Sequence, residues 1–587
     1  MKSLFYIILL PCCFLFTGCT SQQLNAQSAF ESNEWLAENS QPALKIDRYL
    51  SAMEAQGFSG AIIVSAGDDV VLRKGYGYAN RETRQPYTPE TIQTNGSVTK
   101  QFTGAAILHL ESRGKLSVDD PISSYLDPLS EEMQGITIHQ LLTHSSGMPG
   151  GIGSDEEKID AEAYMKRLKG ESLQFDPGTS YAYSNTGYSL LGMIIEQVSG
   201  QSYESYMREE LFLPAGMKHT GYILPGWKRD QMAAGYRNGE LWGEVYQRGW
   251  VEDGPNWHLR GNGGLHTTID DMGKWLKTVQ GRGVLNKDAA RRWTTGYQIG
   301  NSGFSEYGYG WRVYYHNKWG SLITHGGSNG IFEADFVWLS ERDFFFYIQG
   351  NTSMVTARSQ SGNILNAAFD STFVMPPVVE ADESADRALA RQRAGTYVLD
   401  DGKLELMADD TRLVAKITGQ SVIDQLFSHS DEQKKRFAEL NARTQIAMDK
   451  LQSGQKDALS GLIHADDSAI SATAPFIRRI NQIGGLDSLH VVGTFANAPG
   501  SWFSETGPWT TFVYAEFEHW NQYWNLVWSE DETYAANLRG PWPAFTLVPV
   551  AEGQYTGVLQ ETPWNIIELQ FAGECLMNAE LQACKKI

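Results

Sequence analysis

Strand-like segments lie at both ends of the first 375 residues, and this arrangement constrains the fold more than any other feature. Residues 57–77 alternate apolar and polar positions around a short turn, and residues 322–349 contain two strand-like runs joined by a polar turn. Residues 101–112 and 187–200, between them, have helical apolar spacing and end near glycines. Strands that open and close one domain commonly share a sheet. We therefore predict an α+β domain over residues 45–375, with an antiparallel sheet flanked by helices.

The rest of the chain predicts a second domain. A chain of 587 residues is too long for one hydrophobic core, and the run Met375-Pro376-Pro377 is typical of a boundary. Residues 395–419 and 487–570 are strand-like, whereas residues 432–483 look helical. We therefore expect residues 380–587 to form a β-rich accessory domain with a helical segment, whose topology the pattern leaves open.

The amino terminus has the features of an export signal. Residues 1–19 have a basic start, an apolar run too short to span a bilayer, and small residues before Cys19. This pattern predicts a lipoprotein-type signal peptide, lipidation of Cys19 and a tether over residues 20–44. Thr20 is not the Asp that retains lipoproteins in an inner membrane, so we expect a lipid anchor in the outer membrane, facing a Gram-negative periplasm. The alternative is ordinary cleavage near Ala26.

Charge and cysteine content narrow the range of partners. The formal net charge is −21, which repels nucleic acid, so no nucleic-acid partner is expected. Cys575 and Cys584 flank a short loop, and in an oxidising compartment we expect them to form a disulfide, with two free thiols as the alternative. No Cys or His pairs occur at metal-ligand spacing, so no metal is expected.

A Ser-x-x-Lys motif supplies the candidate nucleophile. Three residues on a helix bring two side chains to one face, and a lysine with a lowered pKa can accept a serine proton. The motif occurs at residues 97–100, 112–115 and 453–456. Ser97 follows a turn and begins a predicted helix, where free N–H groups favour an oxyanion, whereas the other two contain a glycine at an exposed end. We therefore predict that Ser97 is the nucleophile and Lys100 its base.

A Tyr-x-Asn motif supplies two further candidates. It occurs at residues 183–185 and also at 78–80, 315–317 and 523–525. Only the first lies in a short loop between a predicted turn and a predicted helix, which would fix its direction. We expect Tyr183 to relay a proton to the leaving group and Asn185 to hold Lys100 or the substrate amide.

The tripeptide His325-Gly326-Gly327 on a predicted inner strand supplies the third element. Two glycines allow close approach of a substrate to the backbone. The N–H groups of Ser328 and Ser97 would then form an oxyanion hole.

Two other motifs compete with this interpretation. Residues 326–330 match the Gly-x-Ser-x-Gly nucleophile elbow, which needs a strand, a sharp turn and then a helix. The residues that follow are strand-like, which argues against an elbow. Residues 219–221 resemble the third element, but they follow Pro214 and Gly216 and are expected to close a turn.

Five blocks occur in an order that resembles the superfamily of class C β-lactamases, D-alanyl-D-alanine carboxypeptidases and related esterases. These blocks are residues 95–104, 136–150, 175–192, 261–276 and 307–330. The resemblance implies an exported serine hydrolase that forms an acyl-enzyme, with catalytic Ser97, Lys100 and Tyr183 and no cofactor. It implies a small ester or a D-amino-acid peptide or amide as substrate, including one derived from cell wall. The alternatives are a penicillin-binding or sensor module with little turnover, and a true β-lactamase.

Two parts of these blocks need separate interpretation. Class C β-lactamases usually carry Lys where this chain has His325, and a neutral imidazole attracts a carboxylate less, although it still donates a hydrogen bond. This departure disfavours dedicated β-lactam hydrolysis. His144, Ser145 and Ser146 are expected to be satisfied polar groups rather than catalytic residues.

Overall fold

The computed structural model describes residues 34–586, apart from short gaps. These gaps are residues 127–128, 300–304, 383, 400–401, 428, 461, 463–472, 475, 478–479, 482–483, 498–506, 519–520, 530–531, 541–543, 560–564 and 579–580. The predicted signal peptide and Cys19 lie outside the described residues. No helix in the described part of the chain is both long and apolar enough to cross a bilayer.

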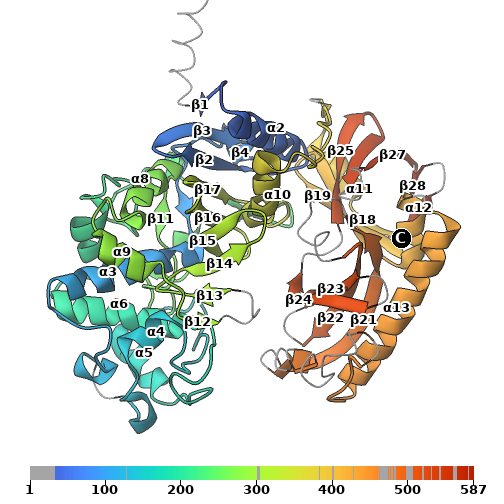
Figure 1. Ribbon diagram of the computed structural model, residues 1–587. Helices are drawn as coiled ribbons and strands as arrows, with labels where there is room; N and C mark the ends of the chain where they lie inside the picture. The colour runs from blue at the N-terminus through green and yellow to red at the C-terminus, as the bar shows by residue number, and fades with distance from the viewer. Residues whose placement is uncertain are drawn as a thin grey trace, which may run out of the picture.

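The first lobe is built on a nine-stranded sheet whose paired strands are all antiparallel (Figure 1). In spatial order its strands are β1 (Trp35–Leu36), β3 (Asp69–Tyr76), β2 (Gly60–Ala66), β17 (Phe344–Gly350), β16 (Glu333–Leu339), β15 (Gly320–Ser328), β14 (Arg312–His316), β13 (Glu306–Tyr307) and β12 (Gln298–Ile299). The inner strand β17 is buried at every residue, because helices cover both faces of the sheet there. It pairs with β2 from Phe344 opposite Ala66 to Gly350 opposite Gly60, which confirms that early and late strands share one sheet.

Helices cover the two faces of this sheet. Helices α2 (Gln41–Ala55) and α10 (Ala357–Phe369) pack on one face and share a core with β2, β16 and β17. The other face packs on α8 (Ile269–Val279) and on a larger helical layer that contains α3 (Thr99–Ser112) and α6 (Asn185–Ser199). Figure 1 shows this layer on the side of the sheet away from α2 and α10.

The second lobe contains a closed eight-stranded barrel. Around the barrel its strands are β18 (Gly395–Val398), β19 (Lys403–Asp409), β20 (Arg412–Thr418), β25 (Ala544–Ala551), β26 (Gln554–Leu559), β27 (Asn565–Ala572), β28 (Cys575–Met577) and β29 (Gln582–Lys585). Cys575 lies opposite Cys584 in the β28–β29 hairpin, and the two form a disulfide. A closed barrel leaves no exposed sheet edge, which suits a domain built mainly from strands.

A second unit is inserted between barrel strands β20 and β25. It consists of the four-stranded sheet β21 (Leu486–Ala496), β22 (Trp509–Phe517), β23 (Gln522–Ser529) and β24 (Glu532–Gly540), with helix α13 (Asp431–Gln452) on one side. Trp524 and Trp528 are fully buried between this sheet and the helix. The expectation of a β-rich accessory domain with a helical segment is confirmed, and its topology is a barrel with a sheet-and-helix insert.

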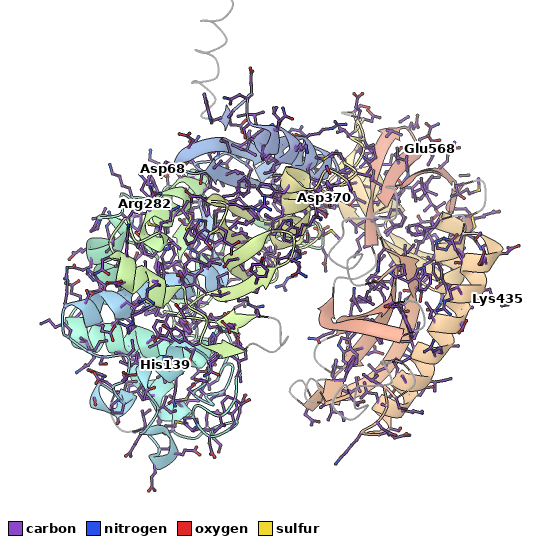
Figure 2. All side chains as sticks on the ribbon, viewed as in Figure 1. Asp68, His139, Arg282, Asp370, Lys435 and Glu568 are labelled. Carbon is purple, nitrogen blue, oxygen red and sulfur yellow. A yellow bond between two sulfur atoms is a disulfide. The ribbon has the colours of Figure 1, made fainter. Side chains whose placement is uncertain are left out.

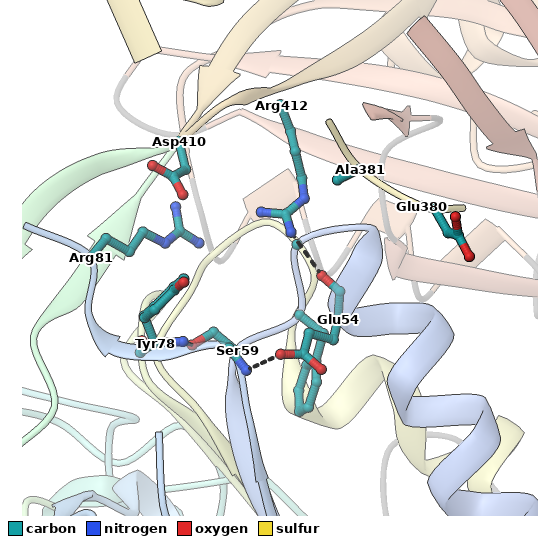
Figure 3. A pocket seen from close by; sticks show the side chains of 11 residues that line it. Glu54, Ser59, Tyr78, Arg81, Glu380, Ala381, Asp410 and Arg412 are labelled. Atoms are coloured by element: carbon teal, nitrogen blue, oxygen red, sulfur yellow. Dashed lines mark hydrogen bonds between the residues drawn. The ribbon is translucent and has the colours of Figure 1, made fainter. Parts of the chain in front are cut away.

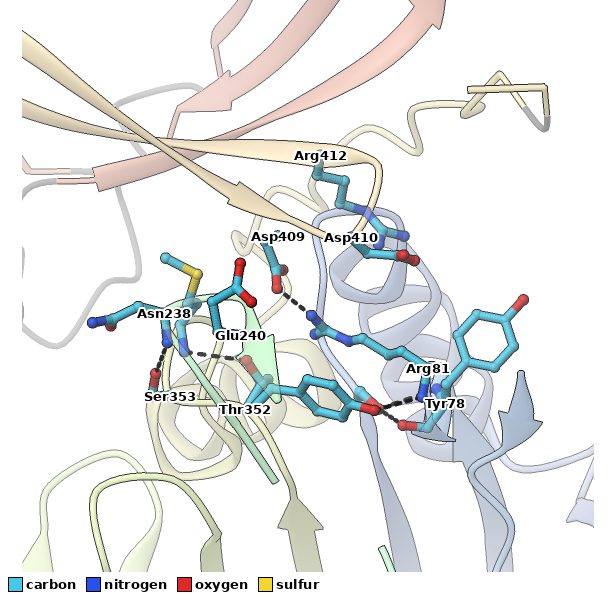
Figure 4. A network of polar contacts seen from close by, with 12 residues as sticks. Tyr78, Arg81, Asn238, Glu240, Thr352, Ser353, Asp409, Asp410 and Arg412 are labelled. Carbon is cyan, nitrogen blue, oxygen red and sulfur yellow. Dashed lines mark hydrogen bonds and ion pairs between the residues drawn. The ribbon is translucent and has the colours of Figure 1, made fainter. Parts of the chain in front are cut away.

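A buried ion pair joins the two lobes. Arg81 of the first lobe pairs with Asp409 at the end of β19, and their side chains are 5% and 0% exposed (Figure 4). Arg412 donates hydrogen bonds to the carbonyl oxygens of Ala55 (2.7 Å) and Glu54 (3.1 Å), at the carboxyl end of α2. A cavity of about 540 Å³ lies beside Arg412 at this junction, and its lining side chains are drawn in Figure 3. Through these two hydrogen bonds the guanidinium of Arg412 caps the carboxyl end of α2 from the barrel side.

Candidate active site

Ser97 and Lys100 lie one helical turn apart where the helical layer meets the sheet. A short 3₁₀ turn, Gly96–Val98, leads directly into α3, so that Ser97 stands at the amino end of the helix. The Nζ of Lys100 lies 3.3 Å from the Oγ of Ser97, and Lys100 is fully buried while Ser97 is partly exposed. A buried amine beside an accessible hydroxyl is the arrangement that a general base and its nucleophile require.

Two carbonyl oxygens complete the surroundings of the amine. The Nζ of Lys100 donates to the Oδ1 of Asn185 (2.8 Å) and to the backbone oxygen of Asn262 (2.7 Å). A carbonyl oxygen only accepts hydrogen bonds. A neutral amine has two N–H groups for these two carbonyls, which leaves its lone pair for the hydroxyl of Ser97. A charged amine would instead donate to all three oxygens, including the Oγ of Ser97. The hydrogen bonds alone therefore fit both forms, and the role of base requires the neutral one.

The electrostatic surroundings of Lys100 favour that form. Burial lowers the pKa of Lys100, and the hydroxyl of Tyr183 and the carboxylate of Asp155 oppose this shift only in part. No carboxylate forms an ion pair with Lys100 among the described residues. The net direction is downward, which is the direction that a lysine base needs.

Tyr183 stands on the loop that precedes α6. Ser184 caps that helix, because its Oγ accepts a hydrogen bond from the N–H of Gly187 (3.0 Å), and this cap fixes where the loop ends. The Nζ of Lys100 lies 4.9 Å from the centre of the Tyr183 ring. The structure thus brings Ser97, Lys100, Tyr183 and Asn185 together, as the sequence predicts.

The end of β15 packs directly against the turn that carries Ser97. A Cβ atom on Gly327 would lie 1.9 Å from the oxygen of Asn95 and 2.9 Å from the backbone nitrogen of Ser97. A Cβ atom on Gly96, which has φ of +52°, would lie 2.7 Å from the backbone nitrogen of Ser328. Only glycine allows this approach, which brings the N–H groups of Ser97 and Ser328 to one place.

His325 differs from the expectation that its imidazole donates a hydrogen bond to substrate. The Nδ1 lies 2.8 Å from the oxygen of Gly326, and the Nε2 lies 2.8 Å from the hydroxyl of Tyr307. Burial, followed by the charges of Lys100 and Arg312, lowers the pKa of His325 well below its usual value. The neutral ring therefore donates from Nδ1 to the carbonyl and accepts from Tyr307 at Nε2, so both nitrogens are engaged inside the protein.

The residues of the competing Gly-x-Ser-x-Gly motif do not form a nucleophile elbow. Residues 326–330 lead from β15 into the antiparallel strand β16, not into a helix, and the Oγ of Ser328 accepts a hydrogen bond from the N–H of Gly330 (2.9 Å). The other Ser-x-x-Lys motifs also lie elsewhere, because Ser112 ends α3 and Ser453 follows the last residue of α13.

Four residues at the site were not assigned to it by the sequence: Asn262, Tyr307, Arg312 and His144. The first contributes a backbone carbonyl, which has no sequence signature. Arg312 is exposed on β14, and no described residue forms a hydrogen bond or an ion pair with its side chain. Burial is the main cause of the lowered pKa of His325 and of His144, and the charge of Arg312 adds to both shifts, so Arg312 acts within the site.

In the block that contains His144, only some of the polar side-chain atoms have hydrogen-bond partners among the described residues. Ser145 shares a hydrogen bond with Thr143 (2.9 Å), and the Oγ of Ser146 accepts from the N–H of Met148 (3.3 Å). The Nε2 of His144 is buried and has no hydrogen-bond partner among the described residues. Within the described part of the chain, His, Cys, Asp and Glu side chains nowhere gather in a group of three able to hold a metal.

The chain is similar to proteins that are named for penicillin binding. Penicillin-binding protein 4* of Bacillus subtilis is 28% identical over 405 residues, which cover 64% of this chain and 88% of that protein. The PbpX protein of the same organism is 33% identical over 288 residues, 49% of this chain and 68% of that protein. The solved octameric penicillin-binding protein homologue from Pyrococcus abyssi is 27% identical, with a TM-score of 0.48, over 64% of this chain and 88% of that one. The family model for Beta-lactamase matches residues 46–368, which is more than half of the chain, and the protein therefore belongs to the β-lactamase family.

Proposed function

We propose that this protein is an exported serine hydrolase that cleaves esters or D-amino-acid peptides and amides through an acyl-enzyme on Ser97. The observation that carries the proposal is the buried amine of Lys100, 3.3 Å from the Oγ of Ser97 and held by two carbonyl oxygens. Burial lowers the pKa of Lys100, so the amine is ready to accept the serine proton.

The proposed reaction has two halves. The Oγ of Ser97 attacks the substrate carbonyl while its proton passes to the Nζ of Lys100, and the N–H groups of Ser97 and Ser328 stabilise the oxyanion. The proton then passes through the hydroxyl of Tyr183 to the leaving group, which departs as an alcohol or amine. In the second half a water molecule gives its proton to the same groups and attacks the acyl carbonyl, which releases the acid and restores Ser97.

Arg312 favours a substrate that carries a carboxylate. It is a cation without a described partner, it stands beside the site, and the protein as a whole has a net charge of −21. Guanidinium groups bind carboxylates in a two-point geometry. A D-amino-acid peptide with a free carboxyl end would use this cation, whereas a simple neutral ester would not. The peptide class is therefore the preferred substrate within the proposal.

A second candidate is a penicillin-binding protein that acylates Ser97 and turns over little. The names of the two Bacillus relatives favour this candidate, because both contain the words penicillin-binding protein. The engaged imidazole of His325 speaks against a dedicated β-lactamase, because neither ring nitrogen is free for a β-lactam carboxylate.

A panel of substrates separates these functions. The protein without residues 1–19 and its Ser97→Ala variant are each mixed with p-nitrophenyl butyrate, a D-alanyl-D-alanine peptide and a chromogenic cephalosporin. Turnover of ester or peptide that is lost in Ser97→Ala supports the hydrolase. Stable labelling by penicillin without turnover supports the penicillin-binding alternative. Equal turnover in both proteins contradicts both candidates.

Export and anchoring are part of the proposal. The Cys575–Cys584 disulfide supports an oxidising compartment, since such bonds persist outside the cytosol. Cys19 would carry the lipid. Metabolic labelling with a radioactive fatty acid tests this step: label in the wild type and its loss in Cys19→Ala are expected, together with release of the protein from the membrane fraction. Label in both would contradict the assignment of Cys19.

A further inference from the structure

The loop of Tyr183 is held from both sides by one residue of another segment. The backbone oxygen of His144 accepts a hydrogen bond from the N–H of Ala182 (3.0 Å). The Nδ1 of the same His144 accepts a hydrogen bond from the N–H of Ser184 (3.1 Å). Tyr183 lies between these two anchored amides, so its backbone has little freedom to turn.

The imidazole also contacts the tyrosine ring itself. The rings of His144 and Tyr183 have centroids 4.3 Å apart, and Tyr307 lies 4.4 Å from the same imidazole. His144 is fully buried. Because its Nδ1 accepts from a backbone N–H, the neutral ring carries its proton on Nε2, where no described residue accepts it. The two rings are tilted by 44°, so the imidazole packs against the Tyr183 ring at an angle.

The backbone of His144 occupies a position that normally selects glycine. Helix α4 (Ile138–Leu142) ends in a Schellman motif, in which Ser145 N–H bonds Gln140 oxygen (2.9 Å) and His144 N–H bonds Leu141 oxygen (3.3 Å). His144 therefore has φ of +58°, in the left-handed region. Glycine or asparagine would fill this position with less strain, so local helix capping does not explain a histidine here.

We propose that His144 is a positioning residue, which fixes the hydroxyl of Tyr183 relative to Lys100 by holding the two flanking amides and packing against the tyrosine ring. This inference deepens the proposed function and rests on it, because the proton relay through Tyr183 is what the positioning serves. A displacement of about 1 Å at a reacting group can cost on the order of a hundred-fold in rate.

Two substitutions at residue 144 separate positioning from folding. His144→Gly removes the imidazole and relieves the left-handed strain. His144→Asn tolerates the same backbone and returns an acceptor, Oδ1, at the place of Nδ1. The matched control is His139→Asn, within the helix α4 that precedes His144. There the imidazole is hydrogen-bonded to the hydroxyl of Tyr309 (2.9 Å). His139 is labelled in Figure 2. Each substitution is also combined with Tyr183→Phe.

The expected result is a split between kcat and KM. His144→Gly lowers kcat for p-nitrophenyl butyrate about a hundred-fold with little change in KM, and His144→Asn recovers about ten-fold of that loss. Tyr183→Phe costs about a hundred-fold or more in the wild type and less than about ten-fold in His144→Gly, because His144 acts through Tyr183. The control leaves both parameters and the full effect of Tyr183→Phe in place.

The opposite results overturn the proposal. If Tyr183→Phe lowers kcat by the same factor in His144→Gly as in the wild type, His144 does not act through Tyr183. The same conclusion follows if His144→Asn recovers none of the kcat that His144→Gly loses. Two measurements do not depend on turnover: nitrogen NMR of the imidazole, which should show the Nε2–H form, and crystal structures of wild type and His144→Gly, which should show the Tyr183 hydroxyl displaced. A wild type without turnover contradicts the proposed function, whereas an undisplaced Tyr183 or an Nδ1–H ring contradicts the positioning role.

Discussion

The Oδ1 of Asn185 accepts a 2.8 Å hydrogen bond from the Nζ of Lys100, so the side-chain partner of this buried amine is a neutral amide and not a carboxylate. An amide oxygen orients the amine without the strong preference for the charged form that a carboxylate would give. Burial therefore keeps the pKa of Lys100 below its usual value, while the hydrogen bond holds the amine beside Ser97.

Replacing that amide by a carboxylate should therefore move the pH profile. In Asn185→Asp a negative charge stands beside the Nζ and raises the pKa of Lys100. The base works only when neutral, so activity appears as the pH rises through this pKa, and the acid limb of kcat/KM should shift to higher pH. Asn185→Ser, which removes the amide without adding charge, is the control. An acid limb that is unchanged in Asn185→Asp would show that Lys100 is not the group that titrates.

Arg312→Gln should change the choice of substrate rather than the chemistry. A charged hydrogen bond is worth about 1.5–3 kcal/mol, so KM for a D-alanyl-D-alanine peptide should rise about ten- to a hundred-fold, while p-nitrophenyl butyrate is unaffected. Arg291→Gln, at an exposed position on α9 (Lys287–Trp293), is the control. Equal effects of Arg312→Gln on both substrates would rule out selective binding of the carboxylate.

His266 should make the fold sensitive to acid. Burial lowers its pKa to about 4, against 6.5 for the unfolded residue. Between these values the unfolded chain binds a proton that the folded chain does not, so the free energy of unfolding should fall by about 1.4 kcal/mol per pH unit as the pH is lowered. In His266→Gln this contribution to the slope should vanish, whereas the exposed His219→Gln should keep it. Denaturant titrations at several pH values measure the slopes, and identical slopes in all three proteins would contradict the account.

The Arg81–Asp409 ion pair should stabilise the junction between the two lobes. Removing one partner leaves an uncompensated buried charge, so Asp409→Ala should lower the free energy of unfolding by about 3–5 kcal/mol. The double variant Arg81→Met with Asp409→Leu should lose less, because no charge is left unpaired. The control is Asp68→Ala, which breaks the exposed pair with Arg282 (2.6 Å, Figure 2) and should change little. Equal losses from the buried and the exposed pair would contradict this interpretation.

The local parts of the site could be predicted from the sequence, and its long-range parts could not. Ser97 and Lys100 are one helical turn apart, and Ser184 marks the start of α6, so their arrangement follows from short spacings. The carbonyl of Asn262 could not be found, because a backbone oxygen has no residue signature. The role of His144 depends on contacts with a loop about forty residues further along the chain.

The same distinction holds for the fold. The short apolar runs of β2 and β15–β17, bounded by turns, and the glycine at the end of α6, with φ of +71°, predict these elements well. The barrel was visible only as strand-like segments. Its closure depends on β20 pairing with β25 across the whole sheet-and-helix insert, and strand pairing over such a distance is not encoded in a local pattern.

The most direct test of the central claim is to trap the acyl group. The protein is mixed with p-nitrophenyl butyrate, quenched in acid within one turnover and examined by intact mass and peptide mapping, beside Lys100→Ala and Ser97→Ala. The account predicts one butyryl group on Ser97 in the wild type, a much slower appearance of it in Lys100→Ala, and none in Ser97→Ala. A butyryl group on Ser328, or continued turnover by Ser97→Ala, would contradict the claim that Ser97 is the nucleophile.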